Sequence, residues 1–199
     1  MRRVLVLALL AMALPMAAWA DGINLMNQFG SISISAAGIT SIHSQLRQFN
    51  NVNTGHSLGS VSFSTGALLT GSIAAGGTFS DAGSTFLVVG KGPDVPHKGT
   101  IFSGSFVGPI TWTLVSQNGQ NVQYELSGTI QGTLWNGMFV TGTTTQLINS
   151  TRGQISLGIG HIRVGNTNIL TPEPSTLGLL GTGLVAIAGV LRRKLTASA

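Results

Sequence analysis

A serine, two histidines and two aspartates are the residues whose types and order could form a hydrolase active site. Gly55-His56-Ser57-Leu58-Gly59 matches the G-x-S-x-G pattern, in which a strained turn between a strand and a helix exposes the serine hydroxyl. Acid and base candidates follow in the required order, namely Asp81 or Asp94 and then His97 or His161. The motif, however, follows the polar run NNVNT and precedes the alternating run SVSFST, which is not a strand–turn–helix context. We therefore interpret Ser57 as part of a loop that enters a strand, and keep serine hydrolase activity as the second alternative function.

Other residues that could bind a metal or cleave a glycosidic bond are too few and too far apart in the sequence. Asp94 and His97 share one loop, but structural metal sites usually need three or four protein ligands. Glu125 is the only acid between that loop and the C-terminal segment, whereas glycosidase chemistry needs two well-placed carboxylates. The chain has no cysteine, which excludes thiol nucleophiles and thiolate metal ligands. We therefore expect no catalytic residue, no metal and no cofactor, and predict that the protein is not an enzyme.

The C-terminal segment has the chemistry of a membrane-targeting signal. Pro172-Glu173-Pro174 is a rigid break, and residues 175–191 after it are apolar and uncharged. As a helix these residues would extend roughly 26 Å, near the thickness of a hydrocarbon core of about 30 Å. Arg192, Arg193 and Lys194 come next, and such cations are retained on the cytoplasmic side of a membrane. This order predicts a transmembrane helix over 175–191 and a basic stop-transfer tail over 192–194.

The order of Pro172-Glu173-Pro174, apolar helix and basic tail resembles the PEP-CTERM sorting signal, to which we assign residues 171–199. The resemblance implies recognition by an exosortase, a membrane protease that cuts near the motif. It also implies an inner-membrane precursor that is then released to the cell surface or to the exopolysaccharide matrix of a biofilm. An ordinary single-pass anchor stays the alternative, because hydropathy alone does not separate an anchor from a sorting signal.

The N-terminal segment predicts export. Met1-Arg2-Arg3 is basic, and the residues that follow as far as Met16 are apolar. Ala18-Trp19-Ala20 fits the A-x-A rule for signal peptidase, so that Ala18 and Ala20 specify cleavage before Asp21. We therefore predict a signal peptide over residues 1–20, and an uncleaved N-terminal anchor is the alternative.

The basic character of the chain belongs to these two targeting segments. The whole chain has a formal net charge of +5 and a pI of about 10.9. Residues 21–171 contain almost equal numbers of cations (Arg47, Lys91, Lys98, Arg152, Arg163) and anions (Asp21, Asp81, Asp94, Glu125). Because no basic stripe remains, the sequence argues against a nucleic-acid partner. The low charge also leaves little repulsion between copies, so that self-association is compatible with the composition.

The region between the targeting segments is dominated by β patterns. Residues 31–35 alternate strictly, while residues 39–49 fit either one or two helical turns or a strand. Residues 91–99 predict a loop, since prolines and glycines interrupt both helices and strands. Asn118-Gly119 and Asn136-Gly137 predict hairpins with type I′ turns. Further strands are expected over 61–63, 67–73, 78–79, 85–89, 100–107, 110–115, 122–130, 133–135, 138–148 and 155–164.

These patterns predict an all-β domain over residues 21–170, flanked by the signal-peptide helix and the transmembrane helix. We expect an antiparallel sandwich or irregular barrel of about nine to twelve short strands. Residues 99–119 are also loosely similar to a segment of PEP-CTERM ectodomains, which implies no activity. We place the following large side chains in or near the core: Phe79, Phe86, Phe102, Phe106, Trp112, Leu114, Leu126, Trp135 and Phe139.

The function that the sequence favours is that of an exported surface or matrix protein with a non-enzymatic structural or interaction domain. The expected partners are signal peptidase, an exosortase, the membrane before processing, and an exopolysaccharide. The first alternative is a glycan-binding sandwich module, in which Trp112, Tyr124 or Trp135 would present an exposed ring to sugars. We favour core positions for these three aromatic residues.

Overall fold

A computed structural model of the chain describes residues 22–171, and residues 1–21 and 172–199 lie outside the described part. The described residues are almost entirely β-structure, with one short helix, α2 (Arg152–Ser156). The strands are β1 (Gly22–Gln28), β2 (Ser31–Ser35), β3 (Gly38–Phe49), β4 (Val52–Asn53), β5 (Gly59–Ser64), β6 (Leu68–Ser72), β7 (Gly76–Phe79), β8 (Thr85–Gly90), β9 (Gly99–Asn118), β10 (Asn121–Leu134), β11 (Phe139–Thr151) and β12 (Ile159–Leu170). The all-β prediction is confirmed.

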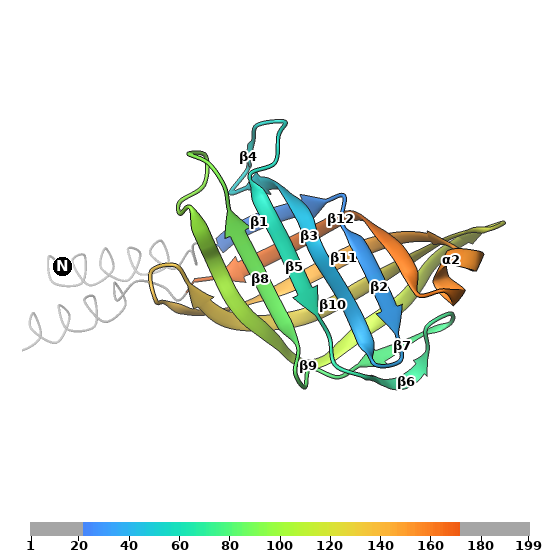
Figure 1. Ribbon diagram of the computed structural model, residues 1–199. Coiled ribbons are helices and arrows are strands. Elements are labelled where there is room, and N and C mark those ends of the chain that lie inside the picture. Colours follow the sequence, from blue (N-terminus) through green and yellow to red (C-terminus); the bar gives the residue numbers. More distant parts are fainter. Residues whose placement is uncertain (1–21, 172–199) are drawn as a thin grey trace, which may run out of the picture. The chain divides into compact units, whose positions relative to one another are not determined.

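The strands form an antiparallel sheet that closes into an eight-stranded barrel (Figure 1). Around the ring the order is β10, β11, β12, β1, β3, β5, β8 and β9, and the pairing of β9 with β10 completes the closure. β2 follows β1 in the same place between β12 and β3, so the two short strands together fill one position of the wall. The hairpin of β6 and β7 extends the sheet from the second half of β9. Of the two architectures that the sequence left open, the structure is thus the barrel.

Alternating side chains build the core, both in strands that the sequence predicted, such as β5, and in β1, which it did not predict. Ile23, Leu25, Val61 and Phe63 all point inward from strands in which they alternate with polar residues. Four phenylalanine rings meet in the centre; the pairs Phe63–Phe86, Phe86–Phe102, Phe86–Phe106 and Phe63–Phe106 have centroid distances of 6.1, 6.1, 5.8 and 6.3 Å. Edge-to-face and offset pairs of this kind stabilise a core beyond the area that they bury. The predicted core positions of Phe79, Phe86, Phe102, Phe106, Trp112 and Leu126 are confirmed, and Leu114 is half-buried against the core.

Two residues that we placed in the core are exposed instead. Phe139 is 59% exposed, because Val140 takes the inward position at the start of β11 and its neighbour must therefore point outward. Trp135 is 37% exposed, because it lies in the turn between β10 and β11 rather than in a strand. The sequence shows that both residues are hydrophobic, but it does not show the strand register, which decides whether a side chain points into the barrel or to the outside.

The segment 39–49, for which helix and strand were both open, belongs to β3. Its apolar residues have helix-like spacing because the strand is irregular. The register of β3 against β5 shifts between Ser41 and Ser44, and His43 has a positive φ of 56°. This bulge moves Leu46 into the core, while Ile42 stays 60% exposed, and a second register shift, against β1 between Leu46 and Gln48, turns Phe49 inward as well. A helix would have placed Ile42 on the same face as the other two.

Both Asn-Gly hairpins are present, but neither has the predicted turn. In the β9–β10 hairpin Asn118 pairs with Asn121, and only Gly119 of the intervening pair has a positive φ, at 58°. Glycine in the first of two central positions is typical of type II′ turns, not type I′. In the β10–β11 hairpin Leu134 accepts from Gly137 N at 2.9 Å, and Gly137 has φ of 81°. This is the three-residue loop with a left-handed glycine that forms a bulge.

Strand lengths and the C-terminal part of the domain differ from the predictions. The segments 100–107 and 110–115 are one strand, β9, of 20 residues, and its register against β10 shifts near Gly108, which has φ of 73°. Segments 122–130 and 133–135 likewise merge in β10. The predicted strand 155–164 begins only at Ile159, because Thr151 and Gln154 form a capping box that starts α2. β1 and the last six residues of β12 were not predicted at all.

Within residues 22–171 no helix combines the length and the hydropathy that a membrane span requires. The predicted signal peptide over 1–20 and the predicted transmembrane helix over 175–191 both lie outside the described residues. Their secondary structure therefore stays a prediction.

Candidate functional site

The end of the barrel at which the domain begins and finishes is the candidate site. Leu170, the last residue of β12, pairs with Thr141 of β11 on one side and with Gly22 of β1 on the other. The chain therefore leaves the domain from β12, which has a hydrogen-bonded strand on each side. The same end carries the β10–β11 turn and the loops before β5 and before β9 (Figure 1). We call this end, with residues 50–58, 91–98 and 135–139 and Leu170, the exit rim.

The predicted targeting residues themselves lie outside the described part of the chain. They comprise the sorting motif (Pro172, Glu173 and Pro174), the stop-transfer cations (Arg192, Arg193 and Lys194) and the signal cleavage site (Ala18, Ala20 and Asp21). The structure places the residue two positions before the motif, Leu170, in a paired strand. These nine assignments remain predictions.

Four large apolar side chains are exposed on one side of the exit rim. Trp135 is 37%, Met138 40%, Phe139 59% and Leu170 50% exposed. The turn is held in place by backbone bonds from Leu134 N to Met138 O and from Trp135 N to Ile101 O, both 2.9 Å long. Phe139 lies two residues from Thr141, the partner of Leu170, so Phe139 and Leu170 are diagonal neighbours on the outer surface. Together these four residues form what we call the rim cluster.

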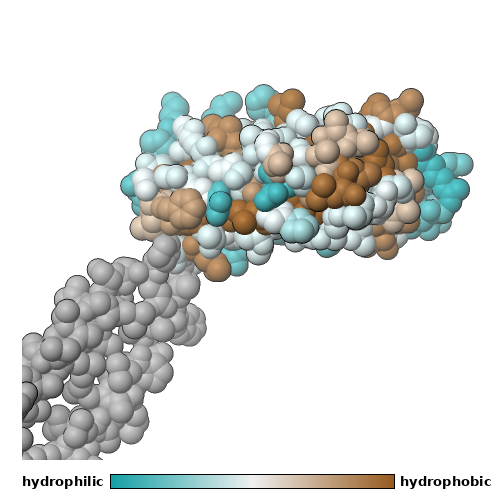
Figure 2. Space-filling model, turned by 90° about the horizontal axis from the view of Figure 1, so that it is seen from below, coloured by the Kyte–Doolittle hydropathy of each residue, from teal (hydrophilic) through white to brown (hydrophobic). Residues whose placement is uncertain are grey.

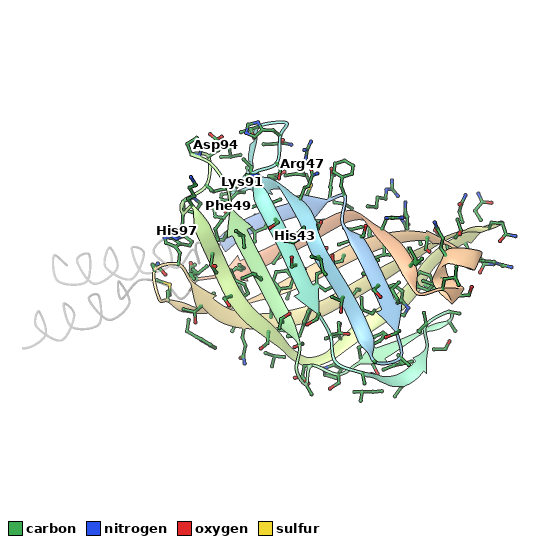
Figure 3. The ribbon with its side chains drawn as sticks, viewed as in Figure 1. His43, Arg47, Phe49, Lys91, Asp94 and His97 are labelled. Carbon is green, nitrogen blue, oxygen red and sulfur yellow. The ribbon has the colours of Figure 1, made fainter. Side chains whose placement is uncertain are left out.

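The polar residues of the exit rim lie on its two longer loops. His56 Nε2 is 3.8 Å from Asp94 Oδ2, and both side chains are well exposed. The His56 ring also contacts Thr54, with Nδ1 3.1 Å from the carbonyl oxygen of that residue. Figure 3 shows Lys91, Asp94 and His97 along the β8–β9 loop. Among the described residues no three His, Cys, Asp or Glu side chains come close enough to bind one metal ion. His56 and Asp94 therefore form a weak, solvated contact between loops.

Ser57 has a structural hydrogen bond. It lies in the loop immediately before β5, as predicted, and its Oγ donates to the Gly59 carbonyl oxygen at 2.8 Å. A nucleophilic serine would instead direct its hydroxyl to a histidine. Asp81, one of the two candidate acids, accepts a 2.7 Å bond from Gly108 N and thereby fixes the bulge in β9. In the described structure the Ser57 hydroxyl is thus directed to a backbone carbonyl oxygen and not to a histidine.

A polar cluster that the sequence did not reveal lies inside the barrel. Asn27 Nδ2 donates to Ser44 Oγ at 2.8 Å and to Gln146 Oε1 at 2.9 Å. Gln146 Nε2 donates in return to Asn27 Oδ1 at 3.3 Å and to Thr144 Oγ1 at 2.9 Å. The Thr144 hydroxyl also shares a 2.8 Å hydrogen bond with Thr167. These five residues are almost completely buried, and the bonds connect β1, β3, β11 and β12. We call them the interior amide cluster.

Glycine makes room for the interior amide cluster. Gly165 of β12 lies between β1 and β11, and a Cβ there would collide with the side-chain oxygens of Gln146 and Asn27. Gly30 makes a similarly close approach, since a Cβ there would lie 2.7 Å from Ser44 Cβ. Buried polar groups stabilise a fold only when their hydrogen bonds are satisfied, and here each side chain has at least one partner. The hydrogen bonds of the cluster therefore stabilise the pairing of β1 with β12, which joins the first and the last strand of the domain.

At the opposite end of the barrel, Trp112 and Tyr124 form a stacked pair. Their ring centroids are 4.5 Å apart and the planes differ by 5°. Trp112 Nε1 donates to Ile73 O and Tyr124 Oη donates to Ala74 O, both at 2.8 Å, so the pair holds the β6–β7 turn. Burial raises the pKa of the Tyr124 phenol above its ordinary value of 10.0.

These positions bear on the three aromatic residues considered for sugar binding. Trp112 and Tyr124 are each 1% exposed, so their predicted core positions are confirmed and they offer no ring face to a ligand. Trp135 alone of the three is exposed. The face in Figure 2 is largely pale, of intermediate hydropathy, with several brown hydrophobic patches, and most of its strongly hydrophilic residues lie near the margins. This surface follows from the Thr, Ser, Asn and Gly content of the outward positions.

Comparison with known proteins identifies the C-terminal segment. Residues 170–194 match the family model described as the PEP-CTERM protein-sorting motif, which confirms the resemblance inferred from Pro172-Glu173-Pro174 and the residues after it. No curated protein and no solved structure matches the chain. The motif supports export by way of a membrane-anchored precursor and processing by an exosortase. The chain thus carries a PEP-CTERM protein-sorting motif that begins at the last residue of the barrel.

Proposed function

We propose that the chain is an exported protein whose barrel is a non-enzymatic structural or interaction domain at the cell surface or in an extracellular matrix. The observation that carries the proposal is the sorting motif over 170–194, which follows β12 without an intervening linker. The nearly neutral composition of residues 21–171, rich in Gly, Ser, Thr and Asn, suits a crowded, glycan-rich exterior.

Each targeting segment has a distinct role in this proposal. The signal peptide over 1–20 directs export, and signal peptidase cuts before Asp21. Residues 175–191 hold the precursor in the inner membrane, and the cations Arg192, Arg193 and Lys194 stop transfer. Pro172 and Pro174 keep Glu173 in an extended segment outside the helix, where its carboxylate is presented to the exosortase. Cleavage near the motif then releases the barrel.

The absence of an enzymatic role is supported by the state of the candidate residues. The Ser57 hydroxyl is engaged by the Gly59 carbonyl, and Asp81 is engaged by the Gly108 amide. Ser57→Ala tests this part of the proposal, because a hydrolase would lose its activity with that change. We expect purified protein and the Ser57→Ala variant to give the same background rate on a panel of ester substrates. A rate that falls at least about a hundredfold in the variant would establish a hydrolase.

Replacing Glu173 with Gln tests whether the motif is read by an enzyme. The change leaves helix length and hydropathy untouched, so a simple anchor would behave as before. A charge-assisted hydrogen bond to the carboxylate contributes about 1.5–3 kcal/mol, so its loss should slow release roughly tenfold or more. In pulse-chase fractionation, uncut precursor of the Glu173→Gln variant should accumulate in the inner membrane. Deleting residues 192–194 is the matched comparison, because it should weaken retention and orientation before any cleavage.

A glycan-binding role is the second candidate, and one surface hollow favours it. The hollow, of about 410 Å³, lies beside the β9–β10 hairpin and contains several amide and hydroxyl side chains. Uncharged amides both donate and accept hydrogen bonds, as sugar hydroxyls require. The amide and hydroxyl side chains concerned are Ser116, Asn118, Asn121, Gln123, Asn149 and Ser150, and Arg163 also lines the hollow. Asn121→Ala combined with Asn149→Ala should reduce co-sedimentation with the host exopolysaccharide if this role is real. Asn166→Ala, an exposed amide outside the hollow, is the control.

A further inference from the structure

The rim cluster is an exposed apolar surface beside the point at which the chain leaves the barrel. Trp135, Met138, Phe139 and Leu170 are each more than one third exposed, and they lie in the β10–β11 turn, at the start of β11 and at the end of the neighbouring β12. Contiguous exposed apolar side chains with a polar surround mark interaction surfaces in soluble domains. The barrel does not need these residues for its core, which is filled by other side chains. The exposure of the rim cluster therefore indicates that it contacts a partner outside the barrel.

Chain length limits how far this surface can be from a membrane. Leu170 is paired on both sides, and the predicted transmembrane helix begins at Ser175. Four residues lie between them, so the path from Leu170 to Ser175 has five residue steps, and each step advances at most about 3.3–3.6 Å when the chain is fully extended. The tether is therefore no longer than about 18 Å, and Pro172 and Pro174 favour the shorter polyproline rise of about 3.1 Å. In the precursor Leu170 thus lies within about 18 Å of the hydrocarbon boundary, a distance that includes the headgroup layer.

The side chains of the exit rim have the chemistry of that layer. Tryptophan is enriched at membrane–water interfaces, where its ring is apolar and its N–H stays hydrated. Methionine, phenylalanine and leucine beside it can enter the acyl boundary, as the apolar face of an interfacial helix does. Lys91 and Lys98 lie on the β8–β9 loop at the same end, opposed there by Asp94 alone. Cations near an anionic bilayer surface add to the attraction.

We propose that the exit rim lies against the lipid bilayer in the precursor, with Trp135, Met138 and Phe139 in the interfacial layer. The inference rests on the proposed function, because it requires residues 175–191 to be in the membrane. It assigns the barrel a fixed orientation, with α2 and the β9–β10 hairpin directed away from the membrane. It also places the extended sorting segment at the bilayer surface, where a membrane protease works.

Quenching of tryptophan fluorescence by brominated lipids tests the orientation on the full chain. Trp19→Phe removes the tryptophan of the predicted signal peptide and keeps the A-x-A pattern, so that Trp112 and Trp135 remain. The variant is purified from a host without an exosortase and reconstituted into phosphatidylcholine–phosphatidylglycerol vesicles with bromines near the headgroup end of the acyl chains. We expect at least about half of the Trp135 emission to be quenched, as for an interfacial indole. Trp112 is 1% exposed and should stay unquenched.

Two further variants make the result specific. Adding Trp135→Phe leaves Trp112 as the emitter, and the quenching should disappear. Adding Leu157→Trp to that chain places an indole on a 76% exposed site next to the start of β12, at the opposite end from Leu170. This indole should also stay unquenched. Equal quenching of Trp135 and of the tryptophan in the Leu157→Trp variant, or no quenching of either, would overturn the proposal.

Separate readouts distinguish a failure of this inference from a failure of the proposed function. Carbonate extraction reports whether the chain is anchored at all. A chain that is extracted contradicts both the anchored precursor and the orientation, whereas an anchored chain with unquenched Trp135 contradicts the orientation alone. If Trp135 is not quenched by brominated lipid, and is shielded from a water-soluble quencher only after co-reconstitution with an exosortase, the rim cluster binds a protein and the assignment to lipid is wrong.

Discussion

Asn27 and Gln146 are 119 residues apart in the chain, and their amide groups face each other inside the barrel. Asn27 Nδ2 donates to Gln146 Oε1 at 2.9 Å, and Gln146 Nε2 donates to Asn27 Oδ1 at 3.3 Å. The pair spans β12, since Asn27 is on β1 and Gln146 on β11. Because an amide pair in an apolar interior has few other partners, it favours one register of β1, β12 and β11 over any shifted pairing.

A double-mutant cycle on this pair should show strong coupling. Asn27→Leu or Gln146→Leu alone leaves the partner amide buried with unmade hydrogen bonds, which should cost about 2–4 kcal/mol of unfolding free energy. The double variant should lose less than the sum of the two single variants, because no orphaned amide of the pair remains. Urea unfolding of the released protein measures all four species. Additive losses within about 0.5 kcal/mol would show that the two amides do not act as a unit.

Gly165→Ala should destabilise the barrel far more than alanine at a glycine with open space around it, such as Gly153. A Cβ at Gly165 collides with the side-chain oxygens of Gln146 and Asn27, so the cluster must open. We expect a loss of about 2–4 kcal/mol, or no folded protein. Gly153→Ala is the matched control, because nothing lies within 4 Å of the added atom and alanine favours the helix there. Melting temperatures of the two variants decide the matter, and similar values would refute the steric role of Gly165.

Stability at high pH should depend on Tyr124. Burial raises the pKa of this phenol above 10.0, so the native state keeps its proton at pH values at which the unfolded chain has lost it. The contribution of Tyr124 is therefore complete below about pH 10 and is lost as the pH rises through the raised pKa. Tyr124 is the single tyrosine of the chain, so ultraviolet absorbance titration follows it alone.

Tyr124→Phe is the variant that isolates this effect. It should cost about 1 kcal/mol near neutral pH through the lost bond to the Ala74 carbonyl, and it should flatten the decline in stability above pH 10. Chemical denaturation of both proteins at pH 8 and pH 10.5 gives the comparison. Stability curves that run parallel over this range would contradict a buried phenol.

The sequence predicted those parts of the barrel in which the inward positions are apolar and the outward positions are mostly polar. Phe86, Phe102 and Phe106 are examples, since each lies in a strand whose inward positions are hydrophobic. β1 has the apolar inward residues Ile23 and Leu25, but its third inward residue, Asn27, is polar, and the end of β12 has the polar inward residue Thr167, so neither segment was predicted as a strand. A pattern with polar residues on both sides is typical of a loop, unless the partner of the buried amide is known. That partner lies over a hundred residues away.

The choice between sandwich and barrel depended on contacts of the same long range. The hairpins are local, and the Asn-Gly pairs indicated both of them. Closure is decided by β1 meeting β12 and by β8 meeting β9 while β9 also pairs with β10, and no local pattern encodes these contacts. The exit rim illustrates the consequence, because Phe139 and Leu170 become neighbours only through the pairing of β11 with β12. The sorting motif, in contrast, is a local signal and was recognised from its residues alone.

The intact mass of the native protein, measured together with its location, tests the central claim most directly. The account predicts a product that begins at Asp21, lacks residues 192–199 and is found at the cell surface or in the surrounding matrix. Cells without the exosortase should instead retain in the inner membrane a longer form that still carries Arg192, Arg193 and Lys194. A product that keeps this basic tail in the inner membrane of cells that contain the enzyme would contradict the account and make the segment an ordinary anchor.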